Sequence, residues 1–189
     1  MRKTISIVIP VFNEEENLRE FYTRLTKVMS EVSYDYDIIF VDDGSRDASS
    51  AILYDLSQND EHVQAYLLSR NFGHQMALTC GLDHAEGDAV ITMDGDLQHP
   101  PELIPELLGL WEAGYEIVQT VRKDTADASK FKKITSSTYY KLINKMAKVH
   151  ITPGGSDFRL MDRVAIEALR LYNERARFIR GLVNNLGFK

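Results

Sequence analysis

The sequence predicts an α/β fold built on a doubly wound, mostly parallel sheet with helices on both faces. Two observations support this fold class: short apolar runs recur along the first two thirds of the chain, and helical patterns of apolar residues separate them. Such alternation implies right-handed crossovers between parallel strands. The 189 residues are enough for one such unit, so we expect a single domain over residues 1–189.

The first predicted strand is the apolar run of residues 5–9, which Pro10 follows. Apolar residues then keep helical spacing from Glu14 to Val32, and Asn13 stands where an N-cap is expected. The same two elements then alternate along the chain. Further strands are expected at residues 36–41, 63–68, 89–93 and 117–121, and further helices at about residues 48–57, 74–84 and 101–111.

The alternation stops after Val121. Residues 130–148 follow a helical pattern rich in lysine, and residues 152–155 are expected to form a loop. An apolar patch and two predicted helices complete the chain, at about residues 158–161, 163–171 and 175–186.

Charge is distributed unevenly along the chain, whose formal net charge is −6. Residues 1–121 hold 7 Lys and Arg against 22 Asp and Glu, whereas residues 122–148 hold 8 against 2. The basic later part suits an anionic partner, such as phosphate groups or a membrane surface. A nucleic-acid partner is disfavoured because the acidic part would repel a long polyanion. The single cysteine, Cys80, excludes a disulfide framework.

Polar residues follow three of the predicted strands, at 13–14, 42–43 and 94–96. The carboxyl ends of parallel strands share one edge of a sheet, where such sheets bind ligands. Carboxylates gathered there need a cation or hydrogen-bond donors, and a divalent metal is the simplest resolution. The Asp94-Gly95-Asp96 run suits Mg²⁺ or Mn²⁺. A hairpin turn is the alternative for Asp-Gly, but residues 97–101 indicate a helix entry.

Six short segments point to one family when they are taken together. They are IVIPVFNEEENL at 7–18, FVDDGS at 40–45, NFG at 71–73, MDGDLQHPPE at 93–102, SDFRL at 156–160 and RFIRG at 177–181. This set resembles family 2 glycosyltransferases, in the branch of dolichyl-phosphate mannose synthase and bacterial polyprenyl-phosphate glycosyltransferases. The resemblance covers nearly the whole chain. It implies a GT-A fold and sugar transfer with inversion at the anomeric carbon.

The resemblance also implies roles for individual residues. The nucleotide sugar would contact Pro10, Val11, Phe12, Glu14, Asp42, Asp94 and Gln98. The metal would bind Asp94 and Asp96, and catalysis would involve Asp157, Asp96 and Arg159. Phosphate groups of the donor or acceptor would meet Arg177 and Arg180. Arg122 and Lys123 follow a predicted strand end, where they are also placed to contact phosphate.

The role of Asp157 stays open between a catalytic base and a group that orients an arginine or the acceptor. A lipid phosphate has a second pKa of about 6, so it is largely dianionic near neutrality and needs little help to become a nucleophile. An acceptor hydroxyl would need a base.

The basic segment 122–148 has two interpretations, a solvated helix face or an interfacial helix on an anionic membrane. The lipid-phosphate resemblance favours the second, at the cytoplasmic face of the cell membrane. Members of this branch usually continue into two transmembrane helices, so we expect residues 1–189 to be the GT-A catalytic part of a longer, membrane-anchored protein, with a naturally soluble relative as the alternative.

The sequence therefore predicts a metal-dependent glycosyltransferase that moves a sugar from a nucleotide diphosphate to a polyprenyl phosphate. UDP-glucose is the preferred donor, followed by UDP-N-acetylglucosamine and GDP-mannose. One alternative is a glycosyltransferase that acts on a saccharide or protein hydroxyl, and another is a nucleotide-sugar-binding module without turnover. The oligomeric state is open, with a homo-oligomer among the alternatives.

Overall fold

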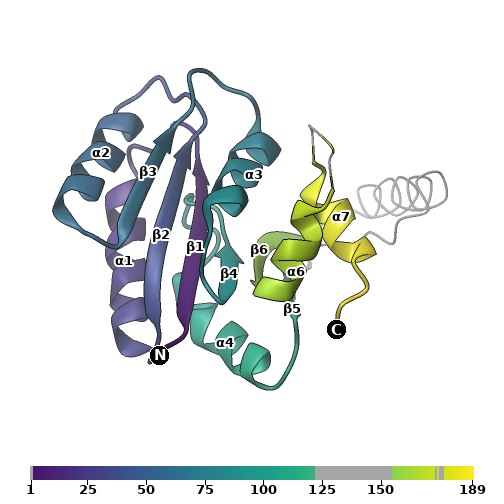
Figure 1. The fold of residues 1–189 in the computed structure, drawn as a ribbon. Helices are drawn as coiled ribbons and strands as arrows, with labels where there is room; N and C mark the ends of the chain where they lie inside the picture. Colours follow the sequence, from purple (N-terminus) through teal and green to yellow (C-terminus); the bar gives the residue numbers. More distant parts are fainter. Residues whose placement is uncertain (1, 122–154, 173, 175–176) are drawn as a thin grey trace, which may run out of the picture.

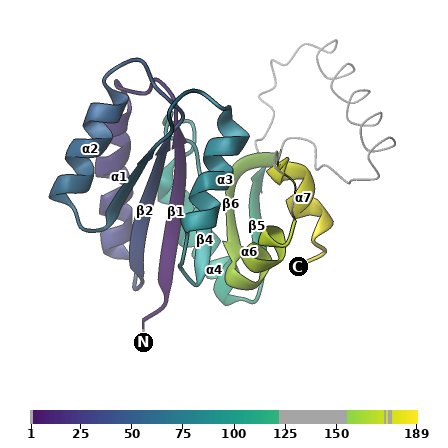
Figure 2. The same ribbon diagram turned by 45° about the horizontal axis from the view of Figure 1, so that its top comes forward.

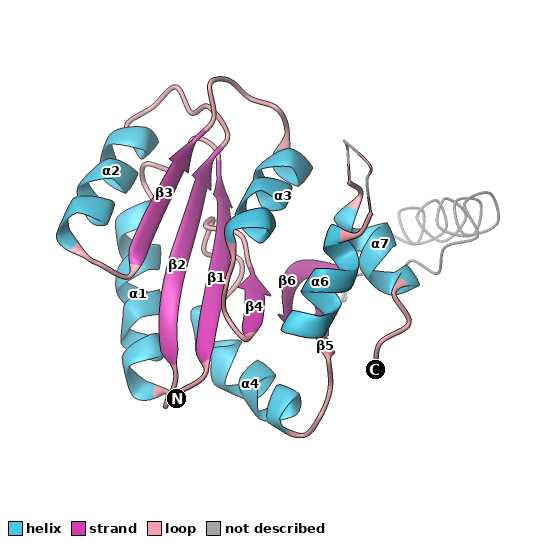
Figure 3. Ribbon diagram, viewed as in Figure 1, coloured by secondary structure: helices cyan, strands magenta, loops and turns pink. Residues whose placement is uncertain are grey.

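The computed structural model describes residues 2–121, 155–172, 174 and 177–189. Within these residues six strands form one sheet in the order β3-β2-β1-β4-β6-β5. The strands are β1 (Thr4–Val11), β2 (Asp35–Asp42), β3 (Val63–Leu67), β4 (Ala89–Thr92), β5 (Ile117–Val121) and β6 (Gly155–Asp162). Figure 3 shows β1, β2 and β3 running in the same direction, with their carboxyl ends at one edge of the sheet. The predicted fold class is confirmed.

Helices cover both faces of this sheet (Figure 1). One face packs against α1, α2 and α4, and the other against α3, α6 and α7, as the two clusters of buried side chains show. Figure 2 shows α6 and α7 beside β6. The helices are α1 (Leu18–Glu31), α2 (Ser49–Asn59), α3 (His74–His84), α4 (Ile104–Glu112), α6 (Arg163–Arg170) and α7 (Ile179–Asn185), and a 3₁₀ turn (Pro101–Leu103) precedes α4.

The first strand lies near the middle of the sheet because apolar residues fill both of its faces. Ile5, Ile7 and Ile9 enter one cluster of buried side chains, and Val8 enters the other. A strand buried on both faces reads as a continuous apolar run rather than as an alternating one. This explains why the sequence predicts β1 within two residues of its observed bounds.

The apolar patch at residues 158–161 is part of a strand, β6, which the sequence pattern does not reveal. β6 runs antiparallel to both β4 and β5 and lies between them. The sheet is therefore mostly parallel with one reversed strand. Because β6 is an interior strand, it brings the residues at its start close to the end of β4.

The first helix begins at Leu18, four residues later than its apolar pattern suggests. Asn13 is not its N-cap; it lies in a turn with φ of 55° and accepts a hydrogen bond from the Arg46 amide at 2.9 Å. None of the helices among the described residues is long and apolar enough to cross a bilayer.

Candidate active site

A cleft of about 380 Å³ opens at the carboxyl ends of the parallel strands. Its walls come from the segments that follow β1, β2 and β4 and from the loop between β3 and α3 (Figure 3). The lining residues are Pro10, Val11, Phe12, Glu14, Asp43, Asn71, Gly73, His74, Asp94, Gly95 and Asp96. Six of the predicted site residues therefore meet in one place, from segments up to about eighty positions apart in the sequence.

The wall after β1 is held by hydroxyl groups from the segment after β2. The amide of Asn13 donates to Ser45 Oγ, and the amide of Glu14 donates to Ser49 Oγ, both at 2.9 Å. These bonds fix the turn that leaves β1. Beside it, Phe12 exposes 42% of its surface, so its ring presents a flat apolar face at the cleft.

The adjacent residues Asp42 and Asp43 have different places in the structure. Asp42, expected to contact the nucleotide sugar, lies outside the cleft lining and is buried, where it accepts bonds from the hydroxyls of Ser45 and Ser50. Asp43 lines the cleft, and its carboxylate accepts the amides of Phe72 at 2.7 Å and Gly73 at 2.9 Å. Hydrogen-bond donors thus offset both charges, and Asp43 ties the β3–α3 loop to the end of β2.

Asp94 lies between two histidines at the cleft. His74, the first residue of α3, donates from Nε2 to Asp94 Oδ1 at 2.8 Å, and this hydrogen bond raises the pKa of His74 despite partial burial. Burial by itself would raise the pKa of Asp94. The hydrogen bond from His74 and the positive charges of His74 and Arg180 outweigh burial, so the pKa of Asp94 lies below its ordinary value.

His99 links the Asp94 loop to β6. The Asp94 amide donates to His99 Nδ1 at 2.9 Å, and His99 Nε2 lies 2.6 Å from Ser156 Oγ. Because Nδ1 accepts a hydrogen bond, Nε2 carries the ring proton and donates to Ser156. His99 is 3% exposed, so it acts as an internal brace between the two segments.

The second carboxylate of the Asp-x-Asp run is turned into the cleft by an unusual loop. Leu97 adopts a φ of 62°, and Asp96 Oδ1 accepts the Gln98 amide at 3.0 Å. Gln98 itself is exposed and lies outside the cleft lining, so its expected contact with the nucleotide sugar stays a prediction.

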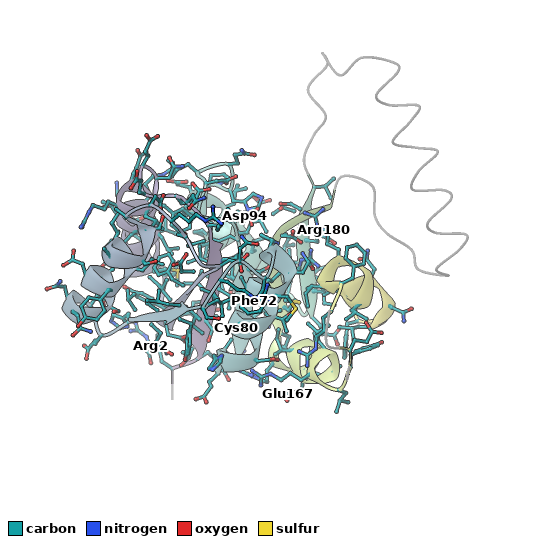
Figure 4. The ribbon with its side chains drawn as sticks, turned by 90° about the horizontal axis from the view of Figure 1, so that it is seen from above. Arg2, Phe72, Cys80, Asp94, Glu167 and Arg180 are labelled. Atoms are coloured by element: carbon teal, nitrogen blue, oxygen red, sulfur yellow. The ribbon has the colours of Figure 1, made fainter. Side chains whose placement is uncertain are left out.

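An ion cluster formed by Asp157, Arg159 and Arg180 lies beside the cleft. Asp157 is 4% exposed and Arg159 is fully buried. Arg159 Nη2 donates to Asp157 Oδ1 at 2.8 Å, while Arg180 donates from Nε and Nη2 to the two carboxylate oxygens at 2.9 and 2.7 Å. Figure 4 labels Asp94 and, to its right, Arg180, whose positive charge contributes to the lowered pKa of Asp94.

Arg177 is bonded to residues outside this cluster. It donates to Asp83 Oδ1 at 2.8 Å and to the Tyr172 carbonyl at 3.2 Å. With Phe178 it lines a second cleft of about 360 Å³, which shares Gly73 and His74 with the first. The two clefts therefore adjoin at the start of α3.

Residues 6–170 match the family model described as glycosyl transferase family 2. The chain belongs to glycosyltransferase family 2. Over 97% of its length it is 45% identical to the uncharacterized glycosyltransferase YkcC of Bacillus subtilis, of which it covers 57%. Over 98% of its length it is 42% identical to the prophage bactoprenol glucosyl transferase homolog of Escherichia coli, of which it covers 60%. The chain thus spans less than two thirds of these relatives.

Solved structures of other glycosyltransferases show that this family 2 chain has the GT-A fold. TarS of Staphylococcus aureus, in complex with UDP-GlcNAc, matches with a TM-score of 0.61 and 15% identity, over 96% of this chain and 53% of that one. The mannosyltransferase PcManGT of Pyrobaculum calidifontis, in complex with GDP-Man and Mn²⁺, matches with a TM-score of 0.60 and 18% identity, over 89% and 47%.

The cleft of this family 2 glycosyltransferase offers a donor set that fits a divalent cation shared with a substrate. Among the described residues, no three His, Cys, Asp or Glu side chains converge on a metal site. Asp94 and Asp96 both line the cleft. Mg²⁺ and similar cations often bind through one or two carboxylates and complete their coordination with substrate phosphates. Two carboxylates at an open cleft fit that pattern.

The cleft also contains five residues that are absent from the predicted set: Asp43, Asn71, Gly73, His74 and Gly95. Asn71 and Gly73 belong to one of the six segments that carry the family resemblance, and His74 follows that segment directly. The sequence therefore already indicated that these residues lie near the site. Arg122, Lys123 and the rest of segment 122–148 lie outside the described residues, and their contacts stay predictions.

Proposed function

We propose that this chain is the catalytic domain of an inverting, metal-dependent glycosyltransferase that moves a sugar from a nucleotide diphosphate to a polyprenyl phosphate. The observation that carries the proposal is the placing of the Asp94 and Asp96 carboxylates in one cleft, next to the cationic cluster around Asp157. The relative from Escherichia coli, named for bactoprenol glucosyl transfer, supports a lipid acceptor.

For the donor we propose UDP-glucose, then UDP-N-acetylglucosamine and then GDP-mannose. The cleft volume of about 380 Å³ is within the range of small-molecule sites. The glucosyl name of the relative supports glucose, and the bound UDP-GlcNAc of TarS and GDP-Man of PcManGT represent the two competing donors. Phe12 and Pro10 would form the wall against the nucleoside.

Cleavage of the bond between sugar and diphosphate develops negative charge on the leaving group. Mg²⁺ or Mn²⁺, held by Asp94 and Asp96, would supply stabilisation of that charge when bound. The chain itself shapes the site: Asp43 holds the β3–α3 loop, and His99 holds the Asp94 loop against β6. Preorganised contacts of this kind lower the barrier because they need no rearrangement during the reaction.

On the acceptor side, Arg180 is the partly exposed member of the ion cluster, with 41% of its side chain accessible, so it is placed to attract a phosphate. Asp157 is bonded to two guanidinium groups. We therefore assign Asp157 to the orientation of these arginines, because a lipid phosphate is already ionised and needs no proton acceptor.

The proposal is tested by incubating the protein with radiolabelled UDP-glucose and undecaprenyl phosphate, in Mn²⁺ or in EDTA. We expect labelled lipid only with Mn²⁺, and a loss of about a hundredfold or more in Asp94→Asn. Asp55→Asn, on the exposed face of α2, is the matched control and should transfer normally.

The variant Asp157→Asn separates the acceptor classes. In Asp157→Asn protein shown by circular dichroism to be folded, a partial loss of transfer fits a phosphate acceptor, and complete loss fits a hydroxyl acceptor that needs a base. Donor binding without transfer or donor hydrolysis in the wild type would contradict the proposal and favour a nucleotide-sugar-binding module.

A further inference from the structure

Arg159 has a buried guanidinium that is only partly used. Its side chain is 1% exposed, and Nη2 donates to Asp157 Oδ1 at 2.8 Å and to the Ser156 carbonyl at 3.1 Å. Within the described part of the chain, Nε and Nη1 are buried without a hydrogen-bond partner. Buried donors are nearly always satisfied, so two orphaned donors on one side chain call for a physical reason.

The two arginines share Asp157 unequally. Arg180 makes two bonds to the carboxylate, one to each oxygen, although 41% of its side chain is accessible to solvent. Arg159, which is fully buried and cannot reach solvent, makes one. Burial lowers the pKa of Arg159, which shows that holding this charge inside the protein is costly. The exposed arginine thus has the stronger hold on Asp157, and the buried arginine keeps donors in reserve.

We propose that Arg159 is a positioning residue that takes over Asp157 when Arg180 turns from Asp157 to the phosphate of the acceptor. This inference rests on the proposed function. Once Arg180 has turned to the phosphate, Asp157 would accept two hydrogen bonds from Arg159. The second of these would come from Nε or Nη1, which have no partner among the residues that the structure describes. Each anion keeps one cation, so neither a bare buried carboxylate nor a carboxylate facing the phosphate is left.

The arrangement explains why Arg159 lies out of reach of the cleft. A phosphate can draw Arg180 away only if the carboxylate it leaves behind has another counterion. Without Arg159, Asp157 would retain Arg180 and would also repel an incoming dianion. Arg159 therefore acts on the acceptor through Asp157 and does not touch it.

The direct test uses arginine side-chain NMR of the whole chain, saturated with UDP and diamagnetic Mg²⁺ and titrated with farnesyl phosphate. We expect the Nε–H signals of both Arg180 and Arg159 to shift along the same binding curve. A shift of Arg180 alone would overturn the inference while leaving a phosphate acceptor in place. If neither signal moves in folded, UDP-bound protein, the inference also fails, because Arg180 then has no phosphate to turn to.

Transfer kinetics give a second test, which compares several variants and therefore does not depend on the correct folding of any single one. Arg159→Lys keeps the charge but lacks the paired donors, so kcat/KM for the lipid phosphate should fall by about tenfold while the Kd for UDP stays within about twofold. In an Arg180→Gln background the same change should have less than about a twofold effect. Arg170→Lys, a partly buried arginine on α6 that bonds to carbonyls at the end of α3, is the matched control and should leave kcat/KM unchanged.

Equal losses from Arg159→Lys in the two backgrounds, or no loss in either, would contradict the inference. Failure of the proposed function has a different signature, namely a wild-type protein that transfers sugar to no polyprenyl phosphate. The two failures are therefore distinguishable.

Discussion

The charged residues around the cleft are each compensated by neighbours from a different segment of the chain. Asp43 accepts hydrogen bonds from two loop amides, Asp94 accepts one from His74, and Asp157 accepts hydrogen bonds from two arginines. All of these contacts except the bond between Asp157 and Arg159, which lie on the same strand, join segments that are 20 or more positions apart in the sequence. The charges therefore contribute to holding the site together as well as to its chemistry, and their removal should be visible in stability.

The pair of His74 and Asp94 predicts a pH-dependent contribution to stability in the absence of metal. The pKa of His74 is raised in the folded protein, so its contribution is complete below about pH 6.5 and is lost as pH rises through the raised pKa. The pKa of Asp94 is lowered, so its contribution is present above about pH 4 and is lost as pH falls through the lowered pKa.

Melting temperatures of the wild type and His74→Gln in EDTA should therefore differ most between about pH 4 and 6.5 and converge at higher pH. His84→Gln, at the other end of α3, is the control. A difference between wild type and His74→Gln that does not depend on pH would show that the pair is not formed.

Removal of the Asp157 charge should destabilise the fold strongly. Asp157→Asn leaves Arg159 buried without its carboxylate, and breaking a buried pair in this way costs about 3–5 kcal/mol. Urea unfolding measures the loss, and Asp157→Asn combined with Arg159→Met should recover part of it. The exposed pair of Arg19 and Asp55 should contribute less than about 1 kcal/mol. Equal effects at both sites would contradict the burial argument.

At the scale of elements, α3 determines how tightly the cleft is built, because its first residue lines the cleft and its middle packs on β1. The sequence predicts the bounds of α3 at residues 74–84, as observed. It also predicts the parallel strands well, because a strand buried on both faces appears as a continuous apolar run. It does not reveal β6, where Ser156, Asp157 and Arg159 interrupt the apolar pattern. Partners of a strand are not encoded locally, so the antiparallel place of β6 could not be predicted.

Two glycines test this packing. A Cβ at Gly81 would lie 2.3 Å from Val8 Cγ1 and 3.2 Å from Val41 Cγ2, so Gly81→Ala should destabilise by about 1–3 kcal/mol despite better helix propensity. Gly109, on the exposed side of α4, has no such neighbour within 4 Å, and Gly109→Ala should stabilise by about 0.5–1 kcal/mol. Chemical denaturation measures both. The two substitutions should change the free energy of unfolding in opposite directions. A stabilising Gly81→Ala would show that α3 does not press on β1.

The β3–α3 loop provides a second test at this scale. Asp43→Ala removes the two hydrogen bonds from the amides of Phe72 and Gly73, which frees the loop that carries Asn71 and leads into His74 at the start of α3. We expect a stability loss of about 1–3 kcal/mol and a UDP affinity lower by about tenfold or more, since the cleft wall loses its anchor. Calorimetry measures the affinity. Unchanged affinity in Asp43→Ala would contradict the role of this wall.

Across the whole molecule, the sheet gathers dispersed residues at one edge. Pro10, Asp43, Asp94 and Asp157 lie at or near the ends of different strands, and they meet because the parallel strands end together and β6 starts beside them. The carboxylate edge was predictable from strand order. The choice between Asp42 and Asp43 was not, because it depends on which side of β2 each carboxylate leaves. The cluster of Asp157 with two arginines depends on the unpredicted β6.

The central claim is that the cleft binds a nucleotide diphosphate with a divalent cation held by Asp94 and Asp96. Calorimetric titration of the wild type and Asp94→Asn with UDP and with GDP, each in Mn²⁺ and in EDTA, tests it most directly. We predict that UDP binds the wild type in Mn²⁺, that GDP binds more weakly, and that EDTA or Asp94→Asn removes the UDP signal. Binding of neither nucleotide to the folded wild type, or UDP binding that is indifferent to both EDTA and Asp94→Asn, would contradict the claim.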